Sequence, residues 1–310
     1  MATARPVPRP ALSLGGSAAR RRREAVARTV LLMAALSSVV ISGFIVYTVA
    51  IEAIDFLSQI ELGWLVEIGW FPRRDMFDVL TLLLGTGMVT VIAMLIATPI
   101  GLASAIYLAE YATPGTRKVV KPILEILAGI PSVVLGFFAL AVINPGFVQA
   151  IFEDAGPFTI LAAGIAVGIL SIPLVASVAE DAMRAVPSSL REASYGLGAR
   201  RVTTSLRIVF PAAISGIVAA LILAASRAIG ETMVVALAAG ATGGGIRSMD
   251  PIAPGQTMTA AMAALATGSE NVVGDYAYQS LFFVGAMLFV ITLLLNIVGD
   301  TFVRRTRQRY

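Results

Sequence analysis

The chain has 310 residues, of which 57% are hydrophobic and only 14% are charged. That balance is far too apolar for a soluble domain of this length and is typical of a protein that crosses a membrane several times. The absence of cysteine and histidine excludes disulfides and thiolate nucleophiles, and it removes the usual general base and the usual metal ligand. We therefore expect neither an intramembrane hydrolase nor a metal site.

The net charge of +4 comes mainly from arginines that gather near the N-terminus, in a central polar loop and in the C-terminal tail. A nucleic-acid-binding surface would need basic residues interleaved with aromatic ones, and nothing in the sequence supplies one. Membrane topology explains the distribution better, because loops on the cytoplasmic side carry an excess of arginine and lysine.

In chain order, residues 1–28 are rich in proline, alanine, serine and arginine, and they predict a basic disordered cytoplasmic arm. Residues 29–51 are long enough for an uncleaved first transmembrane helix. Residues 52–78 are mostly acidic and predict an extracytoplasmic loop, with Trp64 and Trp70 as anchors at the membrane interface.

Residues 79–303 are predicted to form the core of the membrane domain. Further spans are expected over residues 79–107, 120–143, 158–179, 212–238 and 279–303. Gly129, Pro131 and Ser132 interrupt the second of these five, and we expect a helix break there that serves gating or is only a structural kink. Asn144-Pro145-Gly146 predicts a turn.

Two connections complete this topology. The central loop, residues 181–211, is basic and is placed on the cytoplasmic side, whereas residues 239–278 form an extracytoplasmic segment with a possible short helix over 257–266. A basic cytoplasmic tail, 304–310, ends the chain. The alternation of basic and acidic loops predicts six transmembrane helices, with the N- and C-termini both inside.

The central loop carries its own helix signals. Ser189 and Glu192 predict a capping box for a short helix that begins near Leu190, and Gly198 is a natural stop for it. A second short helix is predicted from about Val202 until Pro211, which cannot donate a backbone hydrogen bond. Two short helices separated by a glycine make a compact projection for another protein to bind.

The order of residues in this loop resembles the EAA loop of ABC-transporter permeases. The matching positions are Glu192, Ala193, Ser194, Gly198, Ile208 and Pro211. Ser194 stands where the family often has alanine, and Phe210 where it often has leucine. The resemblance implies that the loop docks into a groove of a cytoplasmic ATPase and transmits its movement, and the alternative is an ordinary amphipathic loop.

Two charged residues lie within the predicted fifth span. Arg227 and Glu231 are four residues apart, which places them on one face of a continuous helix. A charge at mid-membrane costs about 2.5–3.5 kcal/mol on insertion scales, so it needs a reason. Either the two form a structural ion pair, or Arg227 attracts an anion in the translocation path while Glu231 holds Arg227 or repels the anion.

A narrower resemblance rests on three stretches, namely Arg227-Ala-Ile-Gly-Glu-Thr-Met233, Gly129-Ile-Pro-Ser132 and Leu190-Arg-Glu-Ala-Ser194. They look like the phosphate-specific ABC permeases, which work as a PstC/PstA pair, and Gly-Glu-Thr-Met is more similar to the PstC side. The resemblance places Arg227, Glu231 and Thr232 in the substrate path. It adds Arg191 to the ATPase-docking residues.

This resemblance implies an all-α, six-helix permease of the type I ABC importer class in the bacterial inner membrane. Its expected partners are a PstA-like second permease, an ATPase dimer, an extracytoplasmic phosphate-binding protein and membrane lipid. Neither lysine of the chain is followed by serine or threonine, so no phosphate-binding loop can form. The chain is therefore not expected to be an enzyme or to bind a cofactor, and ATP-Mg belongs to the partner ATPase.

Three alternatives remain at this point. The same machine could carry another oxyanion, such as molybdate, sulfate or phosphonate. An ion-coupled secondary transporter would work without an ATPase, and a structural scaffold would bind partners but carry nothing. The spacing from Glu192 to Pro211 disfavours the last two.

Overall fold

The computed structural model describes residues 18–66, 69–240, 245–267 and 276–306. Four sequence predictions therefore fall wholly or partly outside the described residues. They concern the first 17 residues of the N-terminal arm, residues 67–68 of the first outer loop, parts of the 239–278 segment and the last four residues of the tail.

The first helix is longer than predicted. Helix α1 runs over Ala18–Gln59, beyond both ends of the predicted span 29–51, and takes in part of the arm that the sequence predicted to be disordered. Alanine and arginine are strong helix formers, so the helix extends past its apolar centre. The structure separates into two compact units inside this helix, Met1–Thr48 and Val49–Tyr310, and the second unit is described from here on.

One end of the second unit is closed by short irregular elements. These are the 3₁₀ helices η1 (Leu62–Val66) and η2 (Pro72–Arg74) and the antiparallel pair β1 (Trp70–Phe71) and β2 (Met76–Phe77), in which Trp70 pairs with Phe77. Trp70 is buried beside Phe56 and Phe77. The prediction of Trp70 as an interface anchor was therefore wrong, because its ring fills a local apolar core.

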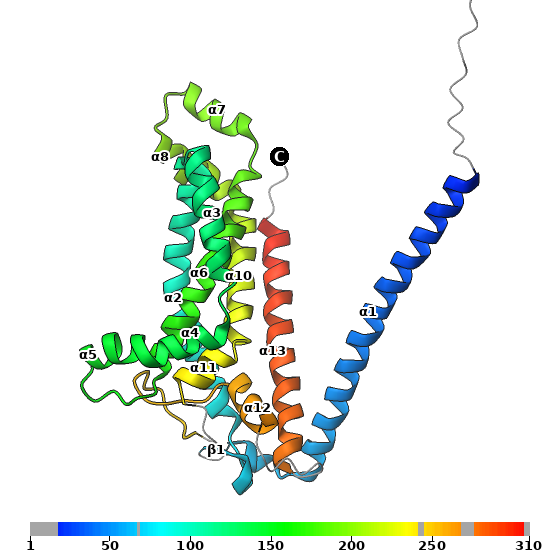
Figure 1. The fold of residues 1–310 in the computed structure, drawn as a ribbon, viewed down its shortest axis with the longest axis vertical. Coiled ribbons are helices and arrows are strands. Elements are labelled where there is room, and N and C mark those ends of the chain that lie inside the picture. Colours follow the sequence, from blue (N-terminus) through cyan, green and yellow to red (C-terminus); the bar gives the residue numbers. More distant parts are fainter. Residues whose placement is uncertain (1–17, 67–68, 241–244, 268–275, 307–310) are drawn as a thin grey trace, which may run out of the picture. The chain divides into compact units, whose positions relative to one another are not determined.

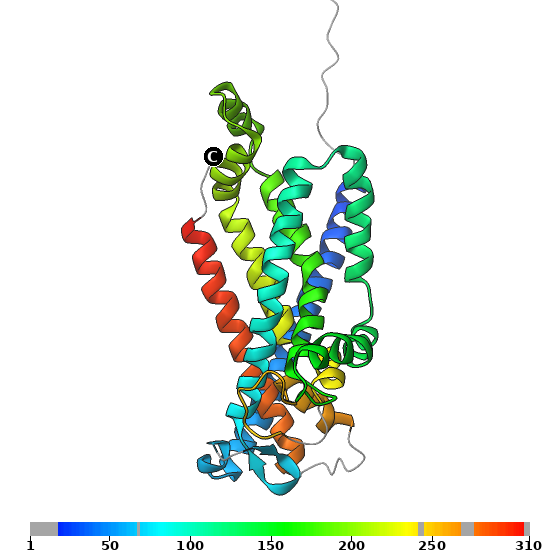
Figure 2. The same cartoon turned by 90° about the vertical axis from the view of Figure 1, so that its left-hand side faces the viewer.

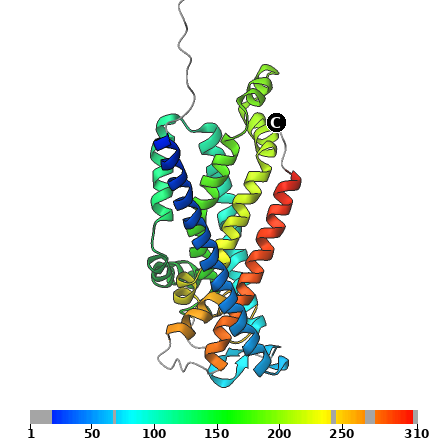
Figure 3. The same ribbon diagram turned by 90° about the vertical axis from the view of Figure 1, so that its right-hand side faces the viewer.

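Four long helices make the body of the unit (Figures 1 and 2). They are α2 (Val79–Ile106, continued by the π-helical turn η3, Tyr107–Tyr111), α6 (Ile160–Arg184), α10 (Ile214–Ile229) and α13 (Tyr276–Thr306). Helices α2 and α6 approach closely, because Gly164 and Gly168 on α6 leave room for Ile92 and Ile96 on α2. Figure 3 shows α13 beside α10.

The predicted span 120–143 is not one helix. It is divided into the amphipathic α3 (Pro114–Ala128), then α4 (Ser132–Phe138), the π-helical η4 (Ala139–Val148) and α5 (Gln149–Ile151). The break falls at the predicted Gly129–Pro131, because proline excludes the residue before it from helical geometry and lacks an N–H. The apolar stretch long enough to cross a membrane begins only at Ser132.

The turn predicted at Asn144-Pro145-Gly146 was also wrong, since these residues lie within η4. The wider π-helical turn accommodates the proline, and the Asn144 side chain holds the following loop instead. Its Nδ2 donates to the carbonyls of Gly156 and Pro157, and its Oδ1 accepts from Thr159 Oγ1.

The remaining helices are short. The central loop contains α7 (Ser188–Gly196), α8 (Arg201–Thr204), the π-helical η5 (Ser205–Val209) and α9 (Phe210–Ala212), and it is followed after α10 by α11 (Met233–Ala238) and α12 (Met258–Thr267). Helix α12 confirms the short helix predicted over 257–266. In Figure 1, α7 and α12 lie at opposite ends of the four-helix body.

Among the described residues, five helices are long and apolar enough to cross a membrane. A sixth span is obtained when α8 to α9 and α10 are counted as one helix bent by 71°. The predicted six-span, all-α architecture is thus confirmed with this bent helix as the fifth span.

Candidate functional site: the central loop and the cavity behind it

The first half of the central loop is closed by Gly198. Helix α7 ends at Gly196, and Gly198 adopts a φ of +76°. The Gly198 N–H donates to the Tyr195 carbonyl at 2.9 Å and the Ala199 N–H to the Ser194 carbonyl at 3.1 Å, which is the Schellman arrangement. The predicted glycine stop is therefore confirmed.

The predicted capping box was wrong. Helix α7 begins at Ser188 with Pro187 at the N-cap position, and no side chain caps it. The fixed φ of Pro187 suits the change from extended to helical backbone, and proline has no N–H that needs a partner. The helix therefore starts one residue before Ser189, which was expected to cap it. Glu192 and Ala193 are exposed on α7 and free to meet a partner.

The second half of the loop is one helical stretch that lies at 71° to α10. Residues 201–212 are helical throughout, and the bend to α10 falls at Ala213, two residues after the predicted boundary at Pro211. Pro211 fits inside the stretch because the preceding π turn already shifts the hydrogen bonding there. Ser194 on α7 and Thr204 on α8 share a buried hydrogen bond of 2.8 Å, which joins the two halves.

The tip of the loop exposes apolar side chains. Leu197 is 90% exposed, and Tyr195, Val202 and Leu206 are also exposed, whereas Ile208 is partly buried. Exposed apolar side chains of this kind are typical of surfaces that meet another protein or the membrane.

Arg191 does not belong to that surface. Its guanidinium turns inward, where Nε and Nη2 donate to Glu110 Oε1 at 3.2 and 2.9 Å. Two further donors reach the carbonyls of Val186 and Met183. The structure thus separates Arg191 from the exposed residues of the loop with which the sequence grouped it.

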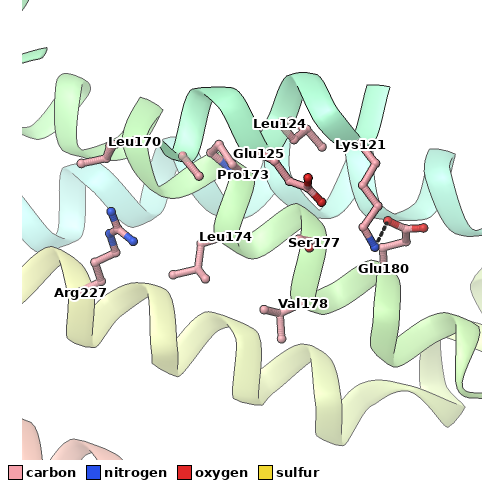
Figure 4. A pocket seen from close by; sticks show the side chains of 11 residues that line it. Lys121, Leu124, Glu125, Leu170, Pro173, Leu174, Ser177, Val178, Glu180 and Arg227 are labelled. Carbon is pink, nitrogen blue, oxygen red and sulfur yellow. Dashed lines mark ion pairs between the residues drawn. The ribbon is translucent and has the colours of Figure 1, made fainter. Parts of the chain in front are cut away.

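Behind the loop, a cavity of about 200 Å³ lies between α3, α6 and α10 (Figure 4). Arg227 of α10 lines one end, and the ion pair of Lys121 with Glu180 lines the other. Glu125 of α3 faces the space between them. The walls are otherwise mainly apolar, formed by Leu124, Ala128, Leu170, Pro173, Leu174 and Val178, with the hydroxyl of Ser177.

Arg227 is the available cation of this cavity. It lies in the last turn of α10, roughly 20 Å along the helix axis from Ile214. Its side chain is exposed, and no acidic group of the described residues comes within ion-pair distance. A guanidinium presents several fixed donors suited to a tetrahedral oxyanion.

The inference that Arg227 and Glu231 share one helix face was wrong. Helix α10 ends at Ile229, Gly230 caps it, and α11 starts only at Met233. Glu231 and Thr232 lie in the break and outside the cavity lining. The Glu231 carboxylate accepts from the Val234 N–H at 3.4 Å, and Thr232 Oγ1 donates to the Gly230 carbonyl at 3.3 Å, so both satisfy the broken backbone.

The two helix breaks lie together. Gly136 of α4 leaves no room for a side chain, because an added Cβ would be 3.0 Å from the Met233 carbonyl oxygen of α11. The break at Gly129, Pro131 and Ser132 is thereby fixed near the break after α10. Irregular backbone at membrane depth is tolerated where protein buries it or where it lines a cavity.

Sequence patterns did not predict the buried carboxylate near the end of α6 that precedes the central loop. Glu180 is fully buried and lies 3.4, 3.5 and 3.7 Å from Arg117, Lys121 and Arg184. Its oxygens accept no hydrogen bond in the described structure. A buried charge requires compensation of this kind. The signal was a Glu180-Asp181 pair at the end of an apolar run. Arg184 lies four residues away on the same helix, but Arg117 and Lys121 lie about 60 residues away on α3.

At the opposite end of the unit, Asp78 connects two segments through hydrogen bonds. This buried carboxylate accepts hydrogen bonds from the Leu80 and Gly69 amides, from Thr81 Oγ1, and from Arg247, whose Nη2 lies 2.7 Å away. Burial acts to raise the pKa of Asp78, but the hydrogen bonds from Arg247, Thr81 and Gly69 lower it below its usual value. Asp78 thus joins the start of α2 to the segment before α12.

A depressed carboxylate pKa gives stability that is present above the unfolded-state pKa and lost as pH falls through the folded-state pKa. We expect Asp78→Asn to lose about 1.5–3 kcal/mol of stability at pH 7, the usual contribution of charge-assisted hydrogen bonds. The difference from wild type should shrink as pH falls below 3.8, the ordinary carboxylate pKa, and through the lower folded-state pKa of Asp78. Thermal unfolding in detergent measures it. Asp75→Asn, an exposed carboxylate nearby, is the matched control, and equal behaviour of the two variants would contradict the prediction.

Residues 97–310 match the model of the family described as the binding-protein-dependent transport system inner membrane component. The chain belongs to this family. It is a multi-pass membrane subunit of an ABC importer and not itself an enzyme. Within the described residues, no group of three or more acidic, histidine or cysteine side chains could hold a metal ion.

Curated relatives of this permease carry related names. It is 38% identical over 192 residues to the probable ABC transporter permease protein YqgH of Bacillus subtilis, a match that covers 61% of each chain. It is 30% identical over 297 residues to the phosphate transport system permease protein PstC of Mesorhizobium japonicum, covering 89% of the permease and 88% of PstC. PstA 1 of Mycobacterium tuberculosis is 36% identical over 182 residues, covering 57% of the permease and 56% of PstA 1.

Solved structures support the fold. The permease matches a chain of a bacterial ABC transporter for the acidic polysaccharide alginate with a TM-score of 0.63 at 16% identity, covering 93% of the permease and all of that chain. A chain of the MetNI methionine ABC transporter in an inward-facing conformation gives a TM-score of 0.54 at 20% identity, covering 74% and 94%. The ABC importer permease fold predicted from the sequence is therefore confirmed.

Proposed function

We propose that this permease forms half of the translocation path of an ATP-driven importer for inorganic phosphate. The assignment of phosphate as the substrate rests on Arg227. Its exposed guanidinium lines the α3–α6–α10 cavity and has no acidic partner within ion-pair distance among the described residues. Phosphate is a tetrahedral oxyanion that such a group binds through paired hydrogen bonds. The PstC relative, which matches nearly the whole chain, agrees with this substrate.

The cavity also explains how an anion could leave again. Glu125 faces the same space as Arg227, and the buried Glu180 lies at the opposite end of the cavity from Arg227 (Figure 4). The carboxylate of Glu125 would weaken the hold of Arg227 on an anion, whereas the charge of Glu180 is compensated by Arg117, Lys121 and Arg184. A transport path must release what it binds. Glu231 and Thr232, which the sequence placed in the path, are proposed instead to stabilise the helix break beside it.

Energy is proposed to come from an ATPase dimer that docks on the central loop and binds ATP-Mg. The exposed cluster of Tyr195, Leu197, Val202 and Leu206 supplies the apolar contact, next to Glu192 and Ala193 on the outer face of α7. Gly198 holds the turn between the two halves. The chain itself binds no cofactor in this proposal.

The central loop end is proposed to face the cytoplasm, with both termini inside, because the basic residues of the chain gather there. A PstA-like second permease would complete the path, lipid would surround the outer helices, and a phosphate-binding protein would meet the opposite end. That end carries Asp75, Glu153 and Asp154, which are exposed.

The energy source is tested by uptake of radiolabelled phosphate into vesicles that hold the assembled complex and its binding protein. Uptake should require ATP on the side of the membrane where the ATPase docks. It should persist when proton and sodium gradients are collapsed. The ATPase should also co-purify with the permease in mild detergent. Gradient-driven uptake without an ATPase would support a secondary transporter and contradict the proposal.

A further inference from the structure

The π turn at the end of α2 is contacted by arginines from three other elements. This turn is η3, Tyr107–Tyr111, and the arginines are Arg117 of α3, Arg191 of α7 and Arg201 of α8. Two of the three elements belong to the central loop. A segment of five residues is therefore held by both halves of that loop and by the helix that lines the cavity.

The contact from α7 is buried and directional. Glu110, whose side chain is 3% exposed, accepts two hydrogen bonds from Arg191 through one oxygen. The same guanidinium donates to the Val186 and Met183 carbonyls, between the end of α6 and α7. Arg191 thus links the loop, the end of α6 and the end of α2 with a planar group that allows little rotation.

The contact from α8 uses an aromatic face. The Arg201 guanidinium lies over the ring of Tyr111, 5.1 Å from its centre, which is within the range of a cation–π interaction. From α3, Arg117 donates through Nε to the Leu108 carbonyl at 3.1 Å and also contacts the Ala109 carbonyl. Arg117 further pairs with Glu180 beside the cavity.

A π turn suits such a junction. Its hydrogen bonds span five residues instead of four, and single π turns within helices occur often at functional sites. A return to α-helical bonding would rotate the residues that follow and would give the element a second discrete arrangement. Coupling between distant sites needs an element of this kind.

The path from this turn to the cavity is continuous. Helix α2 packs against α6 without room for a side chain at Gly101, where an added Cβ would lie 2.7 Å from Val175. Val175 follows Leu174 and Pro173, which line the cavity with Arg227. This close contact connects α2 to the helix that forms the cavity wall.

We infer that the π turn Tyr107–Tyr111 transmits movement of the central loop to the membrane helices. Glu110 and Tyr111 are the positioning residues, contacted by Arg191 and Arg201. This inference rests on the proposed docking of an ATPase. It assigns Arg191 to transmission and not to ATPase contact, because its donors are all directed inward.

The test compares Glu110→Gln and Tyr111→Leu with wild type in vesicles that hold the full complex. Three quantities are measured: ATPase retained on purification, ATP hydrolysed and phosphate imported per ATP. Both variants should retain and drive the ATPase, while phosphate imported per ATP falls roughly five- to a hundredfold, the range of coupling between two linked sites. Glu110→Gln combined with Arg191→Gln should lose no more than Arg191→Gln alone, because both remove the same ion pair.

Two matched controls separate transmission from general damage. Tyr111→Phe keeps the ring under Arg201 and should keep the wild-type ratio. Tyr107→Leu makes the same change as Tyr111→Leu in the same turn, at a side chain that is 48% exposed, and should also keep it.

Wild-type phosphate-to-ATP ratios in both Glu110→Gln and Tyr111→Leu would overturn the inference, and so would loss of ATPase binding in both, which would make the turn a structural support. If Glu110→Gln fails to insert, the Tyr111→Leu and Tyr111→Phe pair decides alone. Failure of the wild-type complex to retain any ATPase would instead refute the proposed function, so the two failures are distinguishable.

Discussion

Arg227→Ala is expected to lower phosphate uptake by at least about tenfold, because one charge-assisted hydrogen bond to the anion contributes roughly 1.5–3 kcal/mol. Assembly should be unaffected, since the side chain is exposed and forms no ion pair with the described residues. Uptake and subunit co-purification are measured on the same membranes. Arg227→Lys, which keeps the charge but not the planar fork, should fall between wild type and Arg227→Ala.

The control for this prediction is Glu231→Gln. Glu231 lies outside the cavity, and glutamine keeps the oxygen that accepts from the Val234 N–H, so uptake should remain near wild type. If Arg227→Ala transports normally, or if Glu231→Gln is as damaging as Arg227→Ala, Arg227 is not the group that meets the anion.

Gly198→Pro is expected to abolish ATPase docking while membrane insertion persists. Proline cannot reach the φ of +76° found at Gly198, and it lacks the N–H that donates to the Tyr195 carbonyl. Without this turn, the exposed cluster of α7 and α8 loses its arrangement. The measurement is ATPase co-purification from solubilised membranes, with permease abundance as the measure of insertion.

A milder pair of variants isolates the backbone effect. Gly198→Ala should destabilise the turn by about 1–2 kcal/mol, the strain of an alanine in the left-handed conformation, although nothing would touch the added Cβ. Gly196→Ala adds the same methyl group two residues earlier, also in open space but within the helix, and should not weaken docking. Equal docking by Gly198→Ala and Gly196→Ala would contradict the role of the turn.

The elements that the sequence predicted well are those specified by local chemistry. Long apolar runs must form helices in a membrane because every backbone group needs an internal partner. Gly198 could be recognised because few other residues accept a positive φ. The break at Pro131 was also predictable from a single residue, although its consequence, an amphipathic α3 ahead of the spanning stretch, was not.

One error came from the assumption of a continuous helix through Gly230. The spacing of Arg227 and Glu231 places them on one face only if Gly230 does not end the helix, and Gly230 ends it. The long-range ion pairs of Glu110, Asp78 and Glu180 could not be derived from the sequence. Their partners Arg191, Arg247 and Lys121 lie 81, 169 and about 60 residues away, so only tertiary packing brings them together.

A competition experiment tests whether inorganic phosphate passes through the α3–α6–α10 cavity. ATP-dependent uptake of radiolabelled phosphate by the reconstituted complex is followed with arsenate, sulfate or molybdate as competitor. Arsenate, which shares the shape and charge of phosphate, should block uptake, whereas sulfate and molybdate should not. Absence of phosphate uptake together with robust ATP-dependent transport of another oxyanion would contradict the proposed substrate.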